Sequence, residues 1–356
     1  MTAAQTKSAV EFDNVSIVFG DNARGALPLM DAGADRAEVR AKTGQILGVH
    51  NASLTVNTGE IVVLMGLSGS GKSTLLRAVN GLNPVTRGEV RVNDGNRMVK
   101  VNGADARTLR NLRLHRVSMV FQQFGLLPWR TVRDNVGMGL EFAGLNAAER
   151  RTKVQEQLEI VGLDGSGDRR VTDLSGGMQQ RVGLARALVT EAPILLMDEP
   201  FSALDPLIRN KLQDELLTLQ ERLKRTILFV SHDLDEAFKI GNRIAILEGG
   251  RIAQTGTPRE IYSNPASDYV SDFVQNMNPL AVLTACDALE PLTESAAGTL
   301  PGGLPIRKAM AALETSGHAM RVVDGAETLG QISPASISRR LLAPNDQELS
   351  VTPSGV

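Results

Sequence analysis

The chain has 356 residues, 42% of them hydrophobic and 22% charged, which is the composition of a globular protein with a full core. The formal net charge of -2 argues against broad nucleic-acid binding, and the single cysteine, Cys286, excludes an intrachain disulfide framework and points to a reducing compartment. No apolar run approaches the roughly 18 to 20 residues that span a bilayer, so a membrane role would need a partner.

The first part of the chain predicts strands that are separated by one insertion. Residues 10–19 alternate well enough to predict a strand, and residues 49–56 and 61–65 predict two more. Between the first two strands, residues 21–45 are rich in Ala, Gly, Asp and Arg and have no strand periodicity. We interpret them as an insertion that contains a short helix.

A glycine-rich loop follows the third predicted strand. Its residues, GLSGSGKST, fit the pattern G-x-x-x-x-G-K-[ST] between a strand and a helical stretch. Glycines let the backbone wrap a phosphate, and the N-terminus of the next helix attracts anions. Lys72 adds a point charge for the β- and γ-phosphates, and the Ser73 hydroxyl is suited to Mg²⁺. The predicted ATP-binding residues of this loop are Gly66, Ser68, Gly69, Ser70, Gly71, Lys72, Ser73 and Thr74.

The middle of the chain alternates strands and helices. A helix is predicted at residues 146–161, where Asn146 and Glu149 resemble a capping box. This alternation predicts an α/β fold around a largely parallel sheet. The further predicted strands are residues 117–121, 194–197, 226–230 and 243–247.

Two acidic residues end the apolar strand at 194–197. We assign Asp198 to Mg²⁺ and Glu199 to the general base that polarises the attacking water. Taken alone, an apolar run that ends in Asp-Glu is as often a plain strand terminus. Together with the Gly71-Lys72-Ser73 loop, it predicts nucleotide hydrolysis.

The residues LSGGMQQR at 174–181 resemble the signature motif of ABC-type ATPases. The alternative is an ordinary helix N-cap by Ser175, but a cap needs neither two glycines nor the Gln-Gln-Arg that follows. The resemblance implies that this surface covers the γ-phosphate of ATP bound to the other subunit, so two chains assemble head to tail as a homodimer. The residues that it assigns to this surface are Ser175, Gly176, Gly177 and Gln179.

The same resemblance assigns roles to four further residues. Gln122 contacts Mg²⁺ and water as a catalytic and metal-binding residue, and Asp205 lies in the loop that links the two ATP sites. His232 holds the γ-phosphate, although a histidine at a strand end is otherwise often structural. Phe19 is the candidate that stacks on adenine, but the insertion lengthens its separation from the phosphate loop beyond the family's common pattern.

Within importer ATPases, several segments look most like the quaternary-amine uptake branch, which imports glycine betaine, choline or proline, and nearest to choline importers. They are residues 42–49, the phosphate loop and residues 124–128. These segments do not touch the solute, so a motor for another small solute stays an alternative. A soluble, non-transport ABC ATPase is the alternative from another class, and it would normally show two cassettes or a long coiled-coil insertion.

The resemblance also implies partners. The segment from Gln122 to Thr131, which contains the only tryptophan, Trp129, is where relatives receive a helix of the membrane permease. The alternative is a partly buried aromatic that closes a loop. We expect a peripheral protein on the cytoplasmic face of the inner membrane, which is served indirectly by a periplasmic or lipid-anchored solute-binding protein.

We therefore expect an α/β P-loop ABC ATPase domain at residues 1–270, with a parallel sheet core, an antiparallel β subdomain and a helical signature subdomain at about 143–190. A small α+β appendage follows at 279–343, and then a disordered tail at 344–356. The helix, strand, turn, strand, helix order of 305–342 resembles one CBS-type repeat. Such a repeat implies regulation, and the alternative is a packing appendage with no sensing role.

Overall fold

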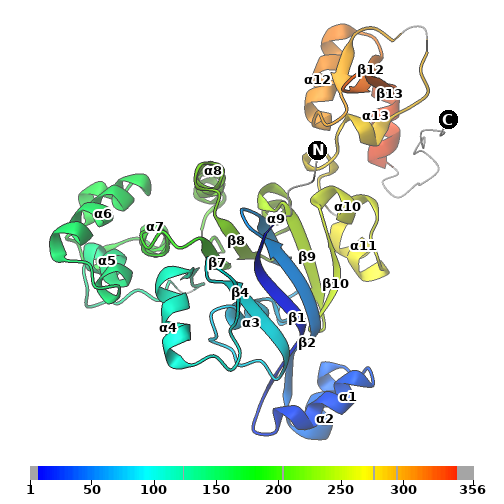
Figure 1. The fold of residues 1–356 in the computed structure, drawn as a ribbon. Coiled ribbons are helices and arrows are strands. Elements are labelled where there is room, and N and C mark those ends of the chain that lie inside the picture. The colour runs from blue at the N-terminus through cyan, green and yellow to red at the C-terminus, as the bar shows by residue number, and fades with distance from the viewer. Residues whose placement is uncertain (1–6, 123, 203, 276, 294–295, 343–356) are drawn as a thin grey trace. The chain divides into compact units, whose positions relative to one another are not determined.

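The computed structural model describes residues 7–122, 124–202, 204–275, 277–293 and 296–342. The chain divides into two compact units, one up to Ala253 and one from Gln254 onward (Figure 1). No helix of the described residues is long and apolar enough to cross a membrane. The tail predicted at 344–356 lies outside the described residues.

A six-stranded sheet forms the centre of the first unit, in the order β10-β9-β3-β8-β7-β6. The neighbouring strands β9 and β3, β3 and β8, β8 and β7, and β7 and β6 pair in parallel. All residues of β3, β7 and β8 are buried, which explains why these strands are continuous apolar runs. The predicted parallel core is confirmed. The strands are β3 (Ile61–Met65), β6 (Val117–Val120), β7 (Ile194–Asp198), β8 (Thr226–Val230), β9 (Arg243–Glu248) and β10 (Arg251–Gly256).

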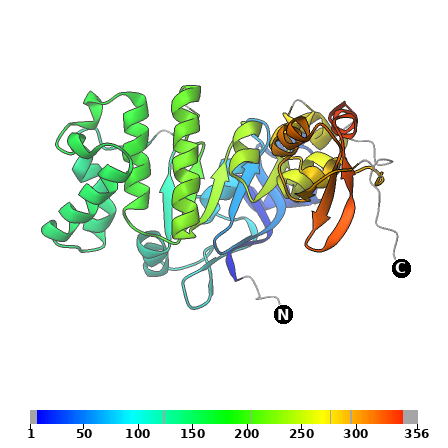
Figure 2. The same ribbon diagram turned by 90° about the horizontal axis from the view of Figure 1, so that it is seen from above.

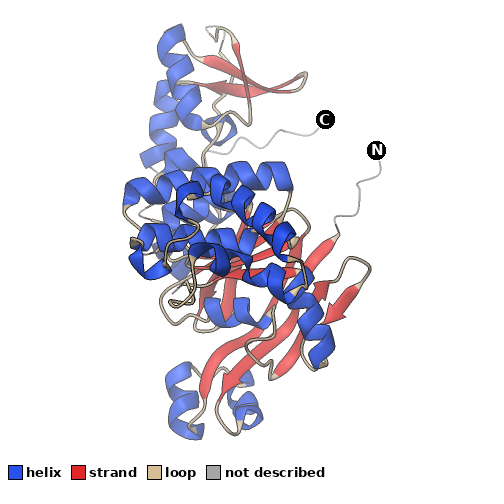
Figure 3. Cartoon of the chain, turned by 90° about the vertical axis from the view of Figure 1, so that its left-hand side faces the viewer, coloured by secondary structure: helices blue, strands red, loops and turns tan. Residues whose placement is uncertain are grey.

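A second, antiparallel sheet has the order β2-β1-β4-β5, and its strands are β1 (Ser8–Phe19), β2 (Ile46–Asn57), β4 (Arg87–Asn93) and β5 (Met98–Lys100). The insertion leaves the end of β1 and returns at the start of β2, where Phe19 pairs with Ile46. It holds a 3-10 turn and two helices, α1 (Leu27–Asp31) and α2 (Arg36–Thr43), which lie beside the ends of β1 and β2 (Figures 1 and 3). The insertion therefore extends the end of a hairpin whose strands stay paired up to Phe19 and Ile46.

Helices surround the two sheets of this unit. Three of them, α5, α6 and α7, share a core and stand to one side of the strands (Figure 2). Val132 and Val136 of α5 belong to this core, so the helical subdomain begins near residue 132 and not at 143. Their spacing of four places both on one helix face. The helices are α3 (Lys72–Ala78), α4 (Ala106–His115), α5 (Val132–Phe142), α6 (Ala147–Ile160), α7 (Gly176–Leu188), α8 (Pro206–Leu223) and α9 (Leu234–Ile240).

The second unit contains a three-stranded sheet in the order β11-β12-β13, with β11 parallel and β13 antiparallel to β12. The predicted helix, strand, strand, helix order is confirmed, and a short strand that the sequence pattern did not indicate, β11, precedes it. The elements of this unit are α10 (Pro258–Ser263), α11 (Asp268–Val274), two 3-10 turns (Pro279–Ala281 and Ala285–Ala288), β11 (Thr299–Pro301), α12 (Ile306–Ser316), β12 (Met320–Asp324), β13 (Glu327–Ile332) and α13 (Pro334–Leu342).

The second unit begins before the boundary predicted between residues 270 and 279. Arg259 of α10 forms an ion pair of 2.7 Å with Asp287, and Arg340 of α13 donates a hydrogen bond of 3.1 Å to Ser263. These contacts tie α10 to segments that follow it by 28 and 77 residues. Because such pairing leaves no trace in local periodicity, the sequence placed α10 with the preceding domain.

Candidate active site

A pocket of about 600 Å³ lies between the phosphate loop, the start of β2 and the insertion. Phe19 and most of the predicted ATP-binding residues of the phosphate loop line it. Gly66 and Ser70 do not, and the Ser70 side chain is buried. Three residues of the insertion line the same pocket, which the sequence did not indicate. The lining residues are Phe19, Arg36, Ala37, Arg40, Ile46, Leu47, Gly48, Ser68, Gly69, Gly71, Lys72, Ser73, Thr74, Gln122 and Glu199.

The phosphate loop is held against its neighbours too closely for any side chain at two of its positions. A Cβ on Gly66 would lie 2.2 Å from the Leu247 carbonyl oxygen, and one on Gly71 would lie 2.5 Å from the Gly48 carbonyl oxygen. Both glycines also have positive φ angles, +139° and +105°. Only glycine meets both conditions, so these positions set the shape of the loop.

Lys72 is the cation inside this loop. Its side chain is buried, and its Nζ donates to the carbonyl oxygens of Gly66 at 2.8 Å and Leu67 at 3.0 Å. Burial lowers the pKa of Lys72, while the charges of Glu199 and Asp198 raise it. The loop carbonyls therefore fix the ammonium at the position where it can receive a phosphate oxygen.

The residues predicted to hold Mg²⁺ supply oxygen ligands beside the loop. Ser73 Oγ donates to Asp198 Oδ1 at 2.6 Å, and Asp198 is fully buried at the end of β7. Hydroxyl and carboxylate oxygens suit Mg²⁺, which completes its shell with substrate phosphates and water. Gln122 lines the same pocket, and its amide oxygen is a further hard ligand. The donor set therefore fits the ion.

Arg77 is a functional neighbour that the sequence analysis missed. Its guanidinium makes a two-pronged contact with Asp198 Oδ2, with Nε at 3.1 Å and a terminal nitrogen at 2.8 Å. This contact holds the second carboxylate oxygen while Ser73 binds the first. The available signal was the spacing, because residues four apart on a helix, here Ser73 and Arg77, share a face.

Three residues predicted to act in hydrolysis converge in the structure. Gln122 Nε2 donates to Glu199 Oε2 at 3.0 Å, and His232 Nδ1 lies 3.2 Å from the same oxygen. They follow β6, β7 and β8, and the carboxyl ends of parallel strands meet at one edge of a sheet. Glu199 also has a φ of +46°, a region that non-glycine residues adopt rarely and at a cost. This strained backbone is typical of a residue held for function.

The residues of the signature segment lie outside this pocket. Ser175 caps α7 by accepting from Met178 N at 3.4 Å, and Gln179 Nε2 donates back to the Leu174 carbonyl at 3.2 Å. Asp205 caps α8 in the same way, from Ile208 N at 3.0 Å. The cap by Ser175, which was the alternative to the signature motif, is therefore present, and Asp205 forms a second cap that the sequence analysis did not predict. Because Ser175, Gly176 and Asp205 are exposed, they remain available to a second chain.

Trp129 lies on the surface of the predicted docking segment. Its exposed fraction is 66%, which contradicts the alternative of a partly buried aromatic that closes a loop. The Trp129 carbonyl accepts a hydrogen bond from Arg170, so the backbone is anchored while the indole ring faces solvent. Gln123, which belongs to this segment, lies outside the described residues.

Comparisons with known proteins agree with this geometry. The family model described as "ABC transporter" matches residues 49–202. The glycine betaine/proline betaine transport system ATP-binding protein ProV of Escherichia coli is 49% identical over 278 residues, which cover 78% of this chain and 68% of that protein. The glycine betaine transport ATP-binding protein OpuAA of Bacillus subtilis is 46% identical over 285 residues, which cover 80% and 67%.

Solved structures are similar to about two thirds of the chain. The dimeric structure of MJ0796, described as a bacterial ABC transporter cassette, is 32% identical with a TM-score of 0.60, and the match covers 70% of this chain and 98% of that one. A second structure of the same cassette is described as a dimeric post-hydrolysis state bound to ADP and Pi, with the same scores.

Proposed function

This chain belongs to the ABC transporter family as an ATP-binding subunit of the glycine betaine and proline betaine import branch, and we propose that its hydrolysis of ATP drives uptake of a quaternary amine through separate membrane subunits. The observation that carries the proposal is the 49% identity over 278 residues with a glycine betaine/proline betaine transport protein. Because other subunits contact the solute, the proposed chemical class of the solute depends on the similarity of this chain to the ATP-binding proteins of known transport systems.

The motor works as a head-to-tail homodimer in this proposal. Each chain supplies one phosphate loop and one signature segment, and the proposal is supported by the observation that Ser175 does not line the pocket of its own chain. A second chain then brings its Ser175 to the γ-phosphate. The solved dimer of the MJ0796 cassette supports this assembly, because that protein shares the fold at 32% identity.

The membrane partner docks at the segment from Gln122 to Thr131. Gln122 contacts the proposed general base directly, and the exposed Trp129 lies seven residues further on. An exposed tryptophan is a residue type that often anchors an interface. ATP binding would close the dimer and hydrolysis would reopen it, while this segment passes the movement to the permease at the cytoplasmic face of the membrane.

We expect a strain that lacks this gene to lose uptake of labelled glycine betaine, and the wild-type gene to restore it. A gene that encodes Glu199→Gln should leave uptake at background, since transport needs turnover. Choline, which the sequence resemblance predicted, and proline betaine are then tested as labelled solutes and as competitors. If the wild-type gene restores uptake of none of these amines, the assignment of the solute class is wrong.

We also propose that the second unit regulates the motor as a single CBS-like repeat that pairs with its copy in the other chain. Its β11, α12, β12, β13, α13 order supports this proposal. Met310 of α12 is 40% exposed although its neighbours Ala309 and Leu313 are buried, so a large apolar side chain is available for pairing.

Met310→Glu is expected to leave basal ATP hydrolysis unchanged and to alter its dependence on salt in the assembled transporter. Ala311→Glu is the matched control, because it adds the same charge at an exposed neighbour without removing a large apolar group. ATPase activity of the reconstituted transporter across a salt series provides the measurement. Identical salt curves for wild type and Met310→Glu reject the regulatory pairing.

A further inference from the structure

We propose that the insertion at residues 21–45 is a nucleotide-binding element, in which Arg36 and Arg40 bind the phosphate chain of ATP. Both arginines line the pocket, and their spacing of four residues puts them on one face of α2. The inference rests on the assignment of this pocket to ATP. Arg36 and Arg40 would then add two positive charges to a phosphate site in which the sequence analysis had identified one, that of Lys72.

Arg36 lies directly against the phosphate loop. Its terminal nitrogens lie 3.7 Å from where a Cβ on Gly69 would stand and 3.4 Å from the same point on Gly71. One of them donates to the Gly48 carbonyl oxygen at 2.7 Å. The guanidinium is therefore held between β2 and the loop that wraps the phosphates.

The charge of Arg36 is not balanced by a neighbouring acid. In the part of the chain that the structure describes, Arg36 forms no ion pair with a carboxylate, and its buried Nε has no hydrogen-bond partner. Burial lowers the pKa of Arg36, although a guanidinium stays charged in proteins. A half-buried cation whose terminal nitrogens lie against the phosphate loop, with no carboxylate to neutralise it, is suited to a phosphate oxygen.

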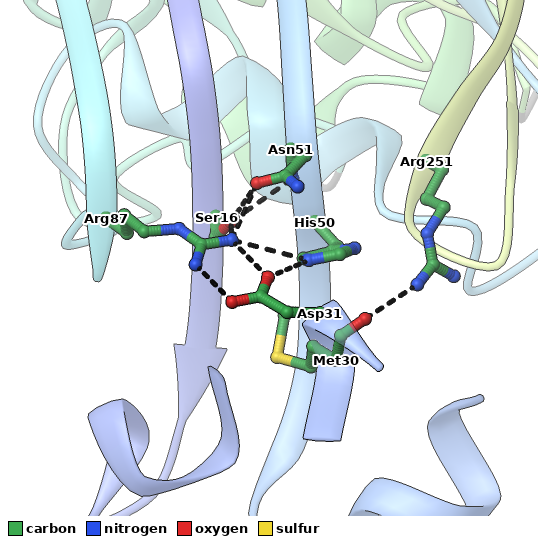
Figure 4. A network of polar contacts seen from close by, with 7 residues as sticks. All are labelled: Ser16, Met30, Asp31, His50, Asn51, Arg87 and Arg251. Carbon is green, nitrogen blue, oxygen red and sulfur yellow. Dashed lines mark hydrogen bonds and ion pairs between the residues drawn. The ribbon is translucent and has the colours of Figure 1, made fainter. Parts of the chain in front are cut away.

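A network of polar contacts holds the insertion in place (Figure 4). Asp31, at the end of α1, receives two hydrogen bonds from Arg87 of β4, at 2.7 and 2.8 Å, and lies 3.0 Å from His50 Nε2 of β2. Arg87 and then His50 hold the pKa of Asp31 well below its usual range. Arg251 also donates to the Met30 carbonyl at 3.2 Å. The carboxylate therefore stays charged and anchors α1 to two strands.

Apolar packing and helix caps complete this support. Met30 of α1 and Val39 of α2 are fully buried in a cluster with Val18 and Leu47 of the two hairpin strands. Asp35 caps the start of α2, accepting from Glu38 N at 2.8 Å. A cation on so fixed a helix loses little conformational freedom when it binds a phosphate, which strengthens the contact.

The alternative is that Arg36 only tethers the insertion to β2 through Gly48. A tether stabilises the fold whether or not a nucleotide is bound. A phosphate contact instead strengthens the binding of ATP and ADP, and it does not affect the binding of adenosine, which has no phosphate. Binding of ATP, ADP and adenosine to the purified full chain separates the two. We expect Arg36→Ala to weaken ATP and ADP binding by roughly tenfold or more, the size of one charge-assisted hydrogen bond, and to leave adenosine binding unchanged.

Three further variants complete the test. Arg36→Lys keeps the charge and should retain part of the affinity. Arg40→Ala should weaken ATP binding less than Arg36→Ala, because Arg36 is the arginine that lies against Gly69 and Gly71. Lys42→Ala is the matched control, since it removes the same charge from the same helix at an exposed residue that pairs with Glu38 and does not line the pocket. It should bind ATP like the wild type.

The outcomes separate the inference from the assignment of the site. If ATP binds normally and Lys72→Ala weakens it, but Arg36→Ala and Arg40→Ala bind like Lys42→Ala, the inference is wrong. A fall in thermal stability of Arg36→Ala with equal effects on ATP and adenosine identifies a tether and also overturns it. If the wild type does not bind ATP, or Lys72→Ala binds it equally well, the ATP site itself is wrongly assigned.

Discussion

Glu199→Gln is expected to slow ATP hydrolysis by roughly 10²- to 10⁴-fold, the usual contribution of a positioned general base, while ATP binding is retained. The substitution removes the base but preserves the size of the side chain, and its amide oxygen can still accept from Gln122. The contacts of Lys72 and Asp198 are not touched. The variant should therefore accumulate as a dimer with ATP bound.

Single-turnover hydrolysis and gel filtration with ATP are the measurements. Glu191→Gln is a matched control, because Glu191 also has a positive φ, +55°, but its exposed side chain pairs with Lys153 away from the pocket. It should hydrolyse ATP at the wild-type rate. A strictly monomeric Glu199→Gln variant that turns over ATP normally would contradict both the catalytic role and the dimer.

Ser175→Arg should abolish hydrolysis and leave ATP binding to the same chain intact. Ser175 is exposed and does not line the pocket of its own chain, so a bulky cation there obstructs only the surface that faces a partner's γ-phosphate. The substitution also removes the cap of α7, which costs about 1 kcal/mol. Ser175→Ala loses the same hydroxyl without the added bulk, so the difference between the two variants measures the obstruction by the arginine.

Mixed dimers provide the measurement. One Ser175→Arg chain beside one wild-type chain should lose the single site that the altered segment covers, so at most about half of the activity remains, and less if the two sites act together. Two fully active sites in such a dimer would show that the head-to-tail arrangement is wrong. Equal inactivity of Ser175→Ala would instead trace the effect to the lost hydroxyl, which caps α7 and is proposed to face the γ-phosphate, and not to the added bulk.

The sequence alone predicted the parts of the site that are contiguous in the chain. The residues from Gly66 to Thr74 follow β3 and open α3 as the pattern requires, and the bounds of β3 and β8 agree with the predicted runs. Such segments are predictable because their apolar runs and glycines report local conformation. Gln122 and His232 were predicted from the resemblance to ABC-type ATPases, and the structure shows that they and Glu199 follow three strands of one parallel sheet.

Residues from distant segments were placed by the tertiary structure. Phe19 lines the pocket because β1 and β2 form one hairpin, in which Phe19 pairs with Ile46 although the insertion separates the two residues in the sequence. The pairing of β1 with β2 also places Arg36 and Arg40 of the insertion beside the same pocket. The packing of α3 on β7 brings Arg77 to Asp198. Sequence periodicity reports which face of an element is buried. It does not report which element lies opposite, because that depends on strand pairing and packing across the whole fold.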